Sequence, residues 1–201
     1  MGIAVNLYLE DWSNGMIHSP QYVFDMMDAL SCGPIRRFMI PDTLGILNPD
    51  NTYAFCSEMI RRYPDVRFDF HAHNDYDLAV ANVMAAVKAG VHGIHTTING
   101  LGERAGNAPL SSVIAVLNDQ IKTPNGVVER RINHVSRVVE TYTGVHIPAN
   151  KPVVGENVFT QCAGIHADGD NKDNLYYNDL LPERFGRVRE YALGKMSGKA
   201  N

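Results

Sequence analysis

The sequence predicts an α/β fold built on a parallel sheet. Four short apolar runs alternate with four segments of helical periodicity, which is the order of a parallel sheet with crossover helices. Polar side chains follow each apolar run, at the strand ends where parallel α/β folds bind ligands. With 201 residues, 45% of them hydrophobic, the chain is long enough to bury the core of one domain or of two small ones.

The predicted strands cover residues 3–9, 36–40, 66–70 and 93–97, and the predicted helices cover residues 19–30, 50–63, 78–89 and 109–118. Two helices begin with strong signals, since Ser19 and Asn48 each precede a proline at the first helical position. Four such βα units make half of an eight-stranded barrel, although an open four-stranded sheet has the same order. Polar residues at all four strand ends favour the half-barrel.

The pattern changes after residue 118. Residues 121–126 form a polar loop, residues 127–142 show the period of one more helix, and the chain beyond Gly144 is rich in Pro, Asn, Gly and Asp. We therefore expect residues 1–120 to form the half-barrel and residues 121–201 to form a helix followed by a loop-rich region.

The composition argues against several classes of protein. A formal charge of −4 gives no electrostatic basis for binding nucleic acid or a membrane surface. No apolar run approaches the roughly 20 residues of a membrane helix, and the first residues lack the pattern of a signal peptide. Cys32, Cys56 and Cys162 are widely spaced and form no CxxC pair, which favours reduced thiols in a cytoplasmic protein.

Two histidines, His71 and His73, follow the third apolar run. Side chains alternate along a strand, so both imidazoles lie on one face and can reach one cation. An HxH pair alone is a weak signal, because strand-end histidines also simply bond to their neighbours. Asn74 and Asp75 come next and could hold the imidazoles by hydrogen bonds from behind.

The segment NGLGERAGN, from Asn99 to Asn107, follows the fourth predicted strand. It superficially resembles a phosphate-binding loop, but its glycines have GxGxxxG spacing and no lysine follows them. Glycine-rich turns of this kind also occur without a ligand. Asn107 could supply an oxygen ligand from this loop, while Glu103 and Arg104 could form either a fixed ion pair or a solvated one.

The first two strands end near Tyr8, Glu10 and Thr43. Alternation places Tyr8 and Glu10 on the same face, where a carboxylate can act as a general acid or base or can hold a cationic partner. A helix-capping or solvated Glu10 is the plainer alternative. Thr43 could bond a substrate carboxylate or could complete a turn with Asp42.

A second polar segment, GIHADGDNKDNLY, contains His166 and Tyr176. Its aspartates match a calcium loop only loosely, because the EF-hand spacing and final glutamate are absent. His166 and Tyr176 could instead act as a general acid or base carried on a mobile element.

Four stretches of the sequence together carry a specific resemblance: HAHNDYDLAVAN, INGLGERAGN, IPANKPVVGENVFTQCAGIHADGD and LGKMSGKAN. In this order, and over essentially the whole chain, they resemble the family of 2-isopropylmalate, homocitrate and citramalate synthases. These are barrel metalloenzymes of Claisen condensation that are related to hydroxymethylglutaryl-CoA lyase. The stretches around His71 and His166 are most similar to (R)-citramalate synthase-like members.

The resemblance implies the C-terminal half of a TIM (β/α)8 barrel, strands five to eight, followed by a helical, loop-rich linker region. It implies an acyltransferase that condenses acetyl-CoA with a 2-oxo acid, either pyruvate or 2-oxoisovalerate, in isoleucine or leucine biosynthesis. It also implies a divalent metal cofactor (Zn²⁺, Mn²⁺ or Mg²⁺) and a homodimer.

The resemblance also implies roles for individual residues. His71 and His73 match the family's metal-binding histidines, and Asn107 matches an asparagine at or near the metal. Glu10 matches the acidic residue that helps proton transfer on acetyl-CoA, and Thr43 matches a threonine that contacts the 2-oxo acid.

Two further matches, His166 and Tyr176, lie in a region that reaches over the partner subunit's barrel in this family. The family's DxTLRDGxQ strand is absent, and it would supply a metal-binding aspartate and an arginine that binds the 2-oxo acid. We therefore expect an incomplete metal site and no synthase activity in this chain alone.

Tyr8 is bulky, so we expect it to narrow the 2-oxo acid pocket and to favour pyruvate. Two alternatives to a synthase stay open. One is a lyase or aldolase of the same superfamily, against which the absence of a cysteine from GLGERAGN argues. The other is a non-catalytic chain, or a split-enzyme subunit that completes its site with a second polypeptide.

Overall fold

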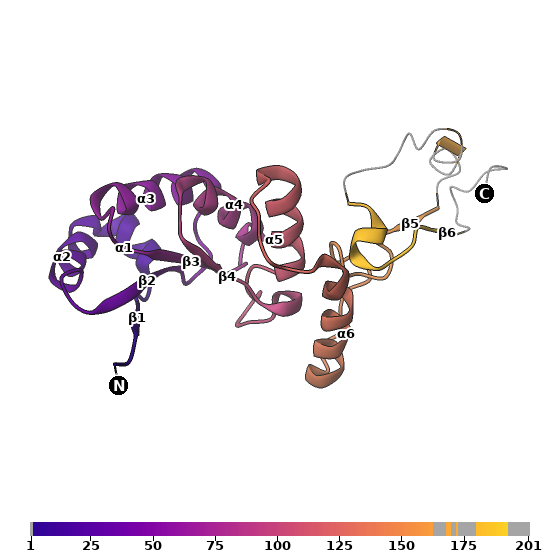
Figure 1. Ribbon diagram of the computed structural model, residues 1–201, viewed down its shortest axis with the longest axis horizontal. Coiled ribbons are helices and arrows are strands. Elements are labelled where there is room, and N and C mark those ends of the chain that lie inside the picture. The colour runs from indigo at the N-terminus through magenta and orange to yellow at the C-terminus, as the bar shows by residue number, and fades with distance from the viewer. Residues whose placement is uncertain (1, 163–167, 170–171, 173–179, 193–201) are drawn as a thin grey trace. The chain divides into compact units, whose positions relative to one another are not determined.

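The computed structural model describes residues 2–162, 168–169, 172 and 180–192 (Figure 1). It divides into two compact units, Met1–Leu117 and Asn118–Asn201. Within the described residues, no helix is long and apolar enough to cross a membrane.

The first unit contains a four-stranded parallel sheet (Figure 1). Its strands are β1 (Val5–Tyr8), β2 (Ile35–Asp42), β3 (Phe68–Ala72) and β4 (Gly93–His95). Their order in the sheet is β1-β2-β3-β4, the same as their order in the chain. This arrangement confirms the predicted α/β class and the four βα units of a partial barrel.

All four predicted helices of this unit are present. They are α2 (Pro20–Leu30), α3 (Pro49–Arg62), α4 (Ala79–Ala89) and α5 (Leu110–Val116). Asn48 caps α3, because its side chain accepts a hydrogen bond from the Asn51 N–H at 2.8 Å. Ser19 makes no such side-chain bond, so the proline after it is the effective start signal of α2.

One helix of the first unit, α1 (Trp12–His18), has no counterpart in the prediction. It has seven residues with a glycine in the middle, and so short a segment is not helical by its own propensity. It is held by packing, since Trp12 and Met16 are buried and a side chain at Gly15 would collide with Val23 of α2.

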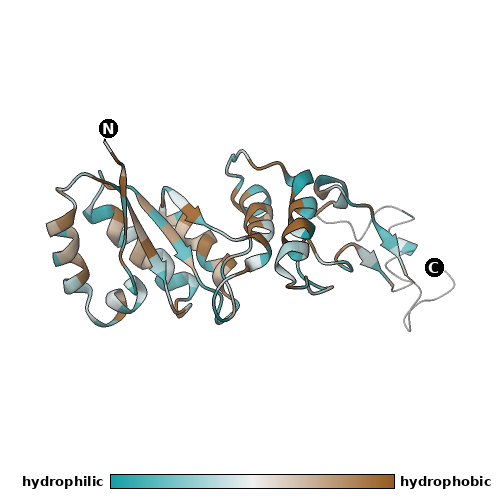
Figure 2. Ribbon diagram, turned by 90° about the horizontal axis from the view of Figure 1, so that it is seen from below, coloured by the Kyte–Doolittle hydropathy of each residue, from teal (hydrophilic) through white to brown (hydrophobic). Residues whose placement is uncertain are grey.

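The two faces of the sheet differ in chemistry. The centre of the apolar face is buried and includes Phe38, Ile40, Phe68 and Phe70, with Phe38 paired to Phe68 and Ile40 to Phe70. Helices α3 and α4 lie along the same side of the sheet (Figure 1). Apolar and polar residues both occur along the strands, as expected when one face is apolar and the other is polar (Figure 2).

Strands β1 and β4 are the two edges of this sheet. Among the described residues, no strand pairs with the outer edge of either one. Ile3 and Val5 are accordingly 89% and 44% exposed at the β1 edge.

The second unit contains short elements. Residues Leu117–Ile121 (η2) lead into it, and it contains η3 (Glu129–Arg131), α6 (Ile132–Thr143), β5 (Thr160–Gln161), η4 (Pro182–Phe185) and β6 (Glu190–Tyr191). The helix predicted from residue 127 therefore begins later, after one tighter turn in which the Arg131 N–H donates to the Val128 carbonyl. Phe159 and Phe185 stack with their ring centres 6.2 Å apart.

Candidate functional site

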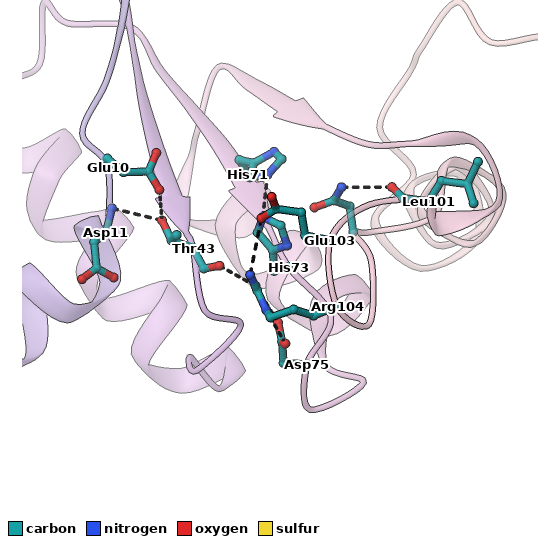
Figure 3. Close-up of polar contacts among 10 residues, drawn as sticks. Glu10, Asp11, Thr43, His71, His73, Asp75, Leu101, Glu103 and Arg104 are labelled. Carbon is teal, nitrogen blue, oxygen red and sulfur yellow. Dashed lines mark hydrogen bonds and ion pairs between the residues drawn. The ribbon is translucent and has the colours of Figure 1, made fainter. Parts of the chain in front are cut away.

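Polar side chains from all four strands meet at the carboxyl edge of the sheet, as the prediction required. They come from the ends of β1 to β4 and from the loops that follow: Tyr8, Glu10, Thr43, His71, His73, His95, Arg104 and Asn107. Figure 3 shows most of them in one view. In a parallel sheet all carboxyl ends lie at one edge, which is why residues far apart in the sequence gather there.

The two predicted metal-binding histidines converge. The Nε2 atoms of His71 and His73 are 3.4 Å apart, and within the described chain neither buried Nδ1 atom has a hydrogen-bond partner. Burial, with smaller contributions from the neighbouring imidazoles, lowers the pKa of His71 to about 4, so its ring is neutral at pH 7. Neutral imidazole is the form that binds metal.

This spacing fits a shared cation. Two nitrogen ligands about 2.0–2.1 Å from one tetrahedral metal ion are about 3.4 Å apart. The pair of His71 and His73 is therefore already arranged as two neighbouring ligands of one ion.

The expectation that Asn74 and Asp75 hold the imidazoles from behind is wrong. The side-chain oxygen Oδ1 of Asn74 accepts from the Ala79 N–H at 3.1 Å, and its side-chain amide nitrogen donates to the Asp77 carboxylate. Asp75 binds Arg104 instead. Both residues shape the loop after β3 rather than the rings.

Asn107 lies beside His73 in the fold. An isolated β-bridge joins it to His73, and its side-chain amide donates to the Leu101 carbonyl at 3.0 Å. That bond fixes the amide, and its Oδ1 atom is buried with no partner in the described part of the chain. Imidazole nitrogens and an amide oxygen are ligand types that divalent metal ions accept.

The glycines of the NGLGERAGN loop have a structural explanation. Gly106 has φ +85°, and a side chain at Gly102 would overlap the Asn107 amide. These two positions thus allow the loop to fold tightly around Asn107. The loop is a support for this asparagine.

Arg104 joins three of the loops at the site. Its guanidinium donates to both oxygens of Asp75, at 2.8 and 3.0 Å, and to the Thr43 carbonyl at 2.7 Å (Figure 3). The expected ion pair with Glu103 exists at 3.7 Å, but Asp75 is the closer partner. The hydrogen bonds from Arg104 lower the pKa of the Asp75 carboxyl.

Glu10 and Thr43 are in direct contact. The Thr43 hydroxyl donates to Glu10 Oε1 at 2.9 Å and accepts from the Asp11 N–H at 3.0 Å (Figure 3). The Glu10 carboxylate is otherwise exposed. The turn role considered for Thr43 belongs to its neighbour Asp42, whose buried carboxylate accepts from two backbone N–H groups of the next turn.

Tyr8 faces the histidines. Its ring lies 6.4 Å from that of His71 in an edge-to-face arrangement, and its hydroxyl is 2.9 Å from Nδ1 of His95. Burial raises the pKa of Tyr8, with added contributions from Asp69 and Glu10, so the phenol stays protonated. His95 was not among the predicted site residues. Its place on the fourth apolar run was its one signal in the sequence. Its position opposite His71 depends on strand register, which a local pattern does not contain.

The remaining predicted site residues, His166 and Tyr176, lie outside the described residues. Within the described part of the chain, no group of three or more His, Cys, Asp or Glu side chains could hold a metal. The candidate metal ligands are therefore His71 and His73, with the amide of Asn107 as the third.

The parallel sheet with polar groups at its strand ends places this chain in the class of α/β barrel proteins. Within that class, the chain belongs to the HMGL-like family, whose model matches residues 2–139. Residues 153–201 match the homocitrate synthase post-HMGL domain-like model.

Three curated relatives each align with 98% of this chain. They are a putative (R)-citramalate synthase of Methanopyrus kandleri (38% identical), a homocitrate synthase of Sulfolobus acidocaldarius (39%) and a probable 2-isopropylmalate synthase of Ignicoccus hospitalis (36%). The chain spans 38%, 42% and 49% of the length of these relatives, respectively.

Solved structures share the fold. An HMG-CoA lyase from Acinetobacter baumannii, in complex with coenzyme A and 3-methylmalate, superposes with a TM-score of 0.58 at 23% identity. The match covers 65% of this chain and 44% of that one. The carboxyl transferase domain of Rhizobium etli pyruvate carboxylase gives a TM-score of 0.54 at 23% identity, covering 61% of this chain and 20% of that one.

Proposed function

We propose that this chain carries part of the active site of an acetyl-CoA-dependent 2-oxo acid synthase. The reaction is a Claisen condensation with pyruvate, as in a citramalate synthase, or with 2-oxoisovalerate, as in a 2-isopropylmalate synthase. The relatives named above support this reaction class. The observation that carries the proposal is the convergence of His71 and His73, Nε2 atoms 3.4 Å apart, at the sheet edge that also holds the Glu10–Thr43 pair.

We propose that residues 1–120 are the C-terminal half of the catalytic barrel and that residues 121–201 are a linker region. The family model over residues 2–139 and the second one over residues 153–201 support a division of this kind. The proposed cellular setting is the cytoplasm, in isoleucine or leucine biosynthesis.

His71, His73 and Asn107 would hold the divalent cation. When bound, such an ion supplies Lewis acidity that polarises the carbonyl of the 2-oxo acid. The donor set is neutral, because it contains two imidazoles and an amide but no carboxylate. We therefore expect this chain alone to bind the ion weakly.

Glu10 is the proposed base that accepts a proton from the methyl group of acetyl-CoA. Its exposure leaves the carboxylate accessible to that group. Thr43 is the proposed contact for the 2-oxo acid. Its hydroxyl oxygen would stay held by the Asp11 N–H while its proton turned from Glu10 toward the substrate. That turn would also free a lone pair of Glu10 for the incoming proton.

Tyr8 is the proposed wall of the 2-oxo acid pocket. Its ring stands edge-on beside His71, with the ring centres 6.4 Å apart. We expect so bulky a wall to admit the methyl group of pyruvate more readily than a branched side chain. His166 and Tyr176 are proposed, from the family resemblance, to act as acid or base groups across a homodimer.

The proposal is tested by joining this chain to the preceding barrel half of the Methanopyrus kandleri relative. Release of CoA from acetyl-CoA is followed with a thiol reagent, with pyruvate or 2-oxoisovalerate, and the products are identified by mass spectrometry. We expect release by the joined protein and none by the 201-residue chain alone. His71→Ala and His73→Ala should abolish it, whereas the exposed His18→Ala should not.

Two results would count against this proposal. A joined, folded and metal-loaded protein that releases no CoA with either 2-oxo acid contradicts the condensation. Release by the isolated chain contradicts the statement that the missing strand is needed.

A further inference from the structure

Four polar side chains on the polar face of the sheet, one from each strand, form a row of successive contacts. In the order of these contacts they are Arg37 on β2, Asp69 on β3, His95 on β4 and Tyr8 on β1. Arg37 Nη1 lies 2.8 Å from Asp69 Oδ2, which lies 3.8 Å from His95 Nε2. His95 Nδ1 lies 2.9 Å from the Tyr8 hydroxyl, which completes the row.

The charges in this row give the hydrogen bonds a direction. Asp69 is buried and paired with Arg37, and its negative charge lies nearer to Nε2 of His95 than to Nδ1. That charge favours the tautomer of His95 in which Nε2 carries the proton. The other nitrogen, Nδ1, then carries a lone pair and accepts from the Tyr8 hydroxyl. Tyr8 is thus the donor at the end of the row.

A glycine makes the row possible. A side chain at Gly93 would collide with the carboxylate of Asp69, which pairs with Gly93 across β3 and β4. Glycine at this position lets Asp69 lie over β4 and approach His95 two residues further on.

The row holds a side chain that would otherwise be loose. Tyr8 lies on edge strand β1 and is 48% exposed, and its hydroxyl has one hydrogen-bond partner in the described chain, His95. The rotamer selected by that bond places the phenol ring edge-on to His71, at 6.4 Å. The ring centres of His95 and His71, which pair across β3 and β4, are 5.7 Å apart.

We propose that His95 is a positioning residue for substrate selection. By holding Tyr8 beside His71, it keeps the space next to the histidine pair small, so that the site takes a 2-oxo acid with a methyl side chain in preference to a branched one. This inference rests on the proposed synthase function and adds to it a residue that fixes the wall of the pocket.

The contact is tested first in the joined protein, whose added barrel half should cover the open edge of β1. The joined protein is labelled with 3-fluorotyrosine, and the Tyr8 signal in the ¹⁹F NMR spectrum is assigned with Tyr8→Phe. We expect one narrow Tyr8 signal that shifts and broadens in His95→Ala and narrows again in His95→Asn, whose amide oxygen can accept the same bond. His18→Ala, an exposed control, should leave the Tyr8 signal unchanged. Circular dichroism should show the same fold in all variants. An unchanged Tyr8 signal in a folded His95→Ala overturns the proposal.

Selection is tested in the joined protein. We expect His95→Ala to lower the ratio of kcat/KM for pyruvate over 2-oxoisovalerate about tenfold, mainly through KM. A loosened pocket wall should lose about as much discrimination between substrates as one methylene group provides. His95→Asn should restore most of the ratio. His95→Ala combined with Tyr8→Ala should give no more change than Tyr8→Ala alone, because both act through one ring.

The outcomes separate the two proposals. An active joined protein whose substrate ratio is unchanged by His95→Ala overturns the role of His95 and leaves the synthase function standing. A joined protein that condenses neither 2-oxo acid overturns both.

Discussion

The hydroxyl of Thr43 donates a hydrogen bond to the carboxylate of Glu10 at 2.9 Å, although 33 residues separate them in the chain. One comes from the turn after β1 and the other from the end of β2. The residue proposed to contact the 2-oxo acid therefore touches the residue proposed to take the proton from acetyl-CoA.

This contact predicts that the two roles are coupled. In the joined protein, Thr43→Val removes the donor and should lower kcat/KM for the 2-oxo acid by about tenfold to a hundredfold. Thr43→Ser, which keeps the hydroxyl, should retain most of the activity. The exposed Thr123→Val serves as control, and equal losses in all three variants would contradict the prediction.

The histidine pair predicts a weak but specific ion site. Titration calorimetry of the 201-residue chain with Zn²⁺ or Mn²⁺ should show one site. His71→Ala and Asn107→Ala should each weaken it about tenfold or more, because each removes a ligand. His18→Ala should not. Equal binding by all four proteins would show that the ion binds elsewhere.

The bridging role of Arg104 predicts a local loss of order. Arg104→Lys keeps the charge but cannot bind both oxygens of Asp75 together with the Thr43 carbonyl. Solvent screens this pair, so we expect little change in the overall stability of the chain. Hydrogen exchange over residues 99–107 should nevertheless accelerate, and unchanged exchange there would contradict the bridging role.

The second unit should lose stability in acid. Arg184 donates to Glu129 at 2.6 Å, and this bond lowers the pKa of Glu129 below its ordinary value of 4.5. A lowered folded-state pKa gives stability that is fully present above about pH 4.5 and is lost as the pH falls through the folded-state value. Glu129→Gln should cost about 2 kcal/mol at pH 7.

This effect is measured by urea unfolding between pH 3 and 7. The difference between the wild-type chain and Glu129→Gln should shrink toward the acid end. A difference that does not depend on pH would assign the loss to packing instead of charge.

The open sheet predicts association. The outer edges of β1 and β4 have no partner strand among the described residues, and unpaired strand edges recruit other strands. Light scattering of the purified chain should therefore show oligomers or aggregates. A monodisperse monomer at micromolar concentration would contradict this prediction.

Much of the architecture could be predicted from local patterns. Apolar runs and helical periods placed the four strands and α2 to α5, and alternation placed His71 and His73 on one face. Helix α1 was missed because its residues favour a helix only when Trp12 and Met16 are buried. The expectation that Asn74 and Asp75 hold the imidazoles was wrong, because the partners of loop side chains depend on the path of the folded loop.

The sequence by itself determined the class of fold, the histidine pair and the asparagine loop, because these follow from periodicity, strand alternation and a contiguous motif. The tertiary structure decided which distant groups meet. Tyr8 and His95 are 87 positions apart in the chain. They touch only because the parallel register gathers the carboxyl ends of all four strands at one side of the sheet. Arg104 pairs with Asp75 more closely than with its neighbour Glu103 for the same reason. Register and loop path depend on the packing of the whole sheet, and no local pattern contains them.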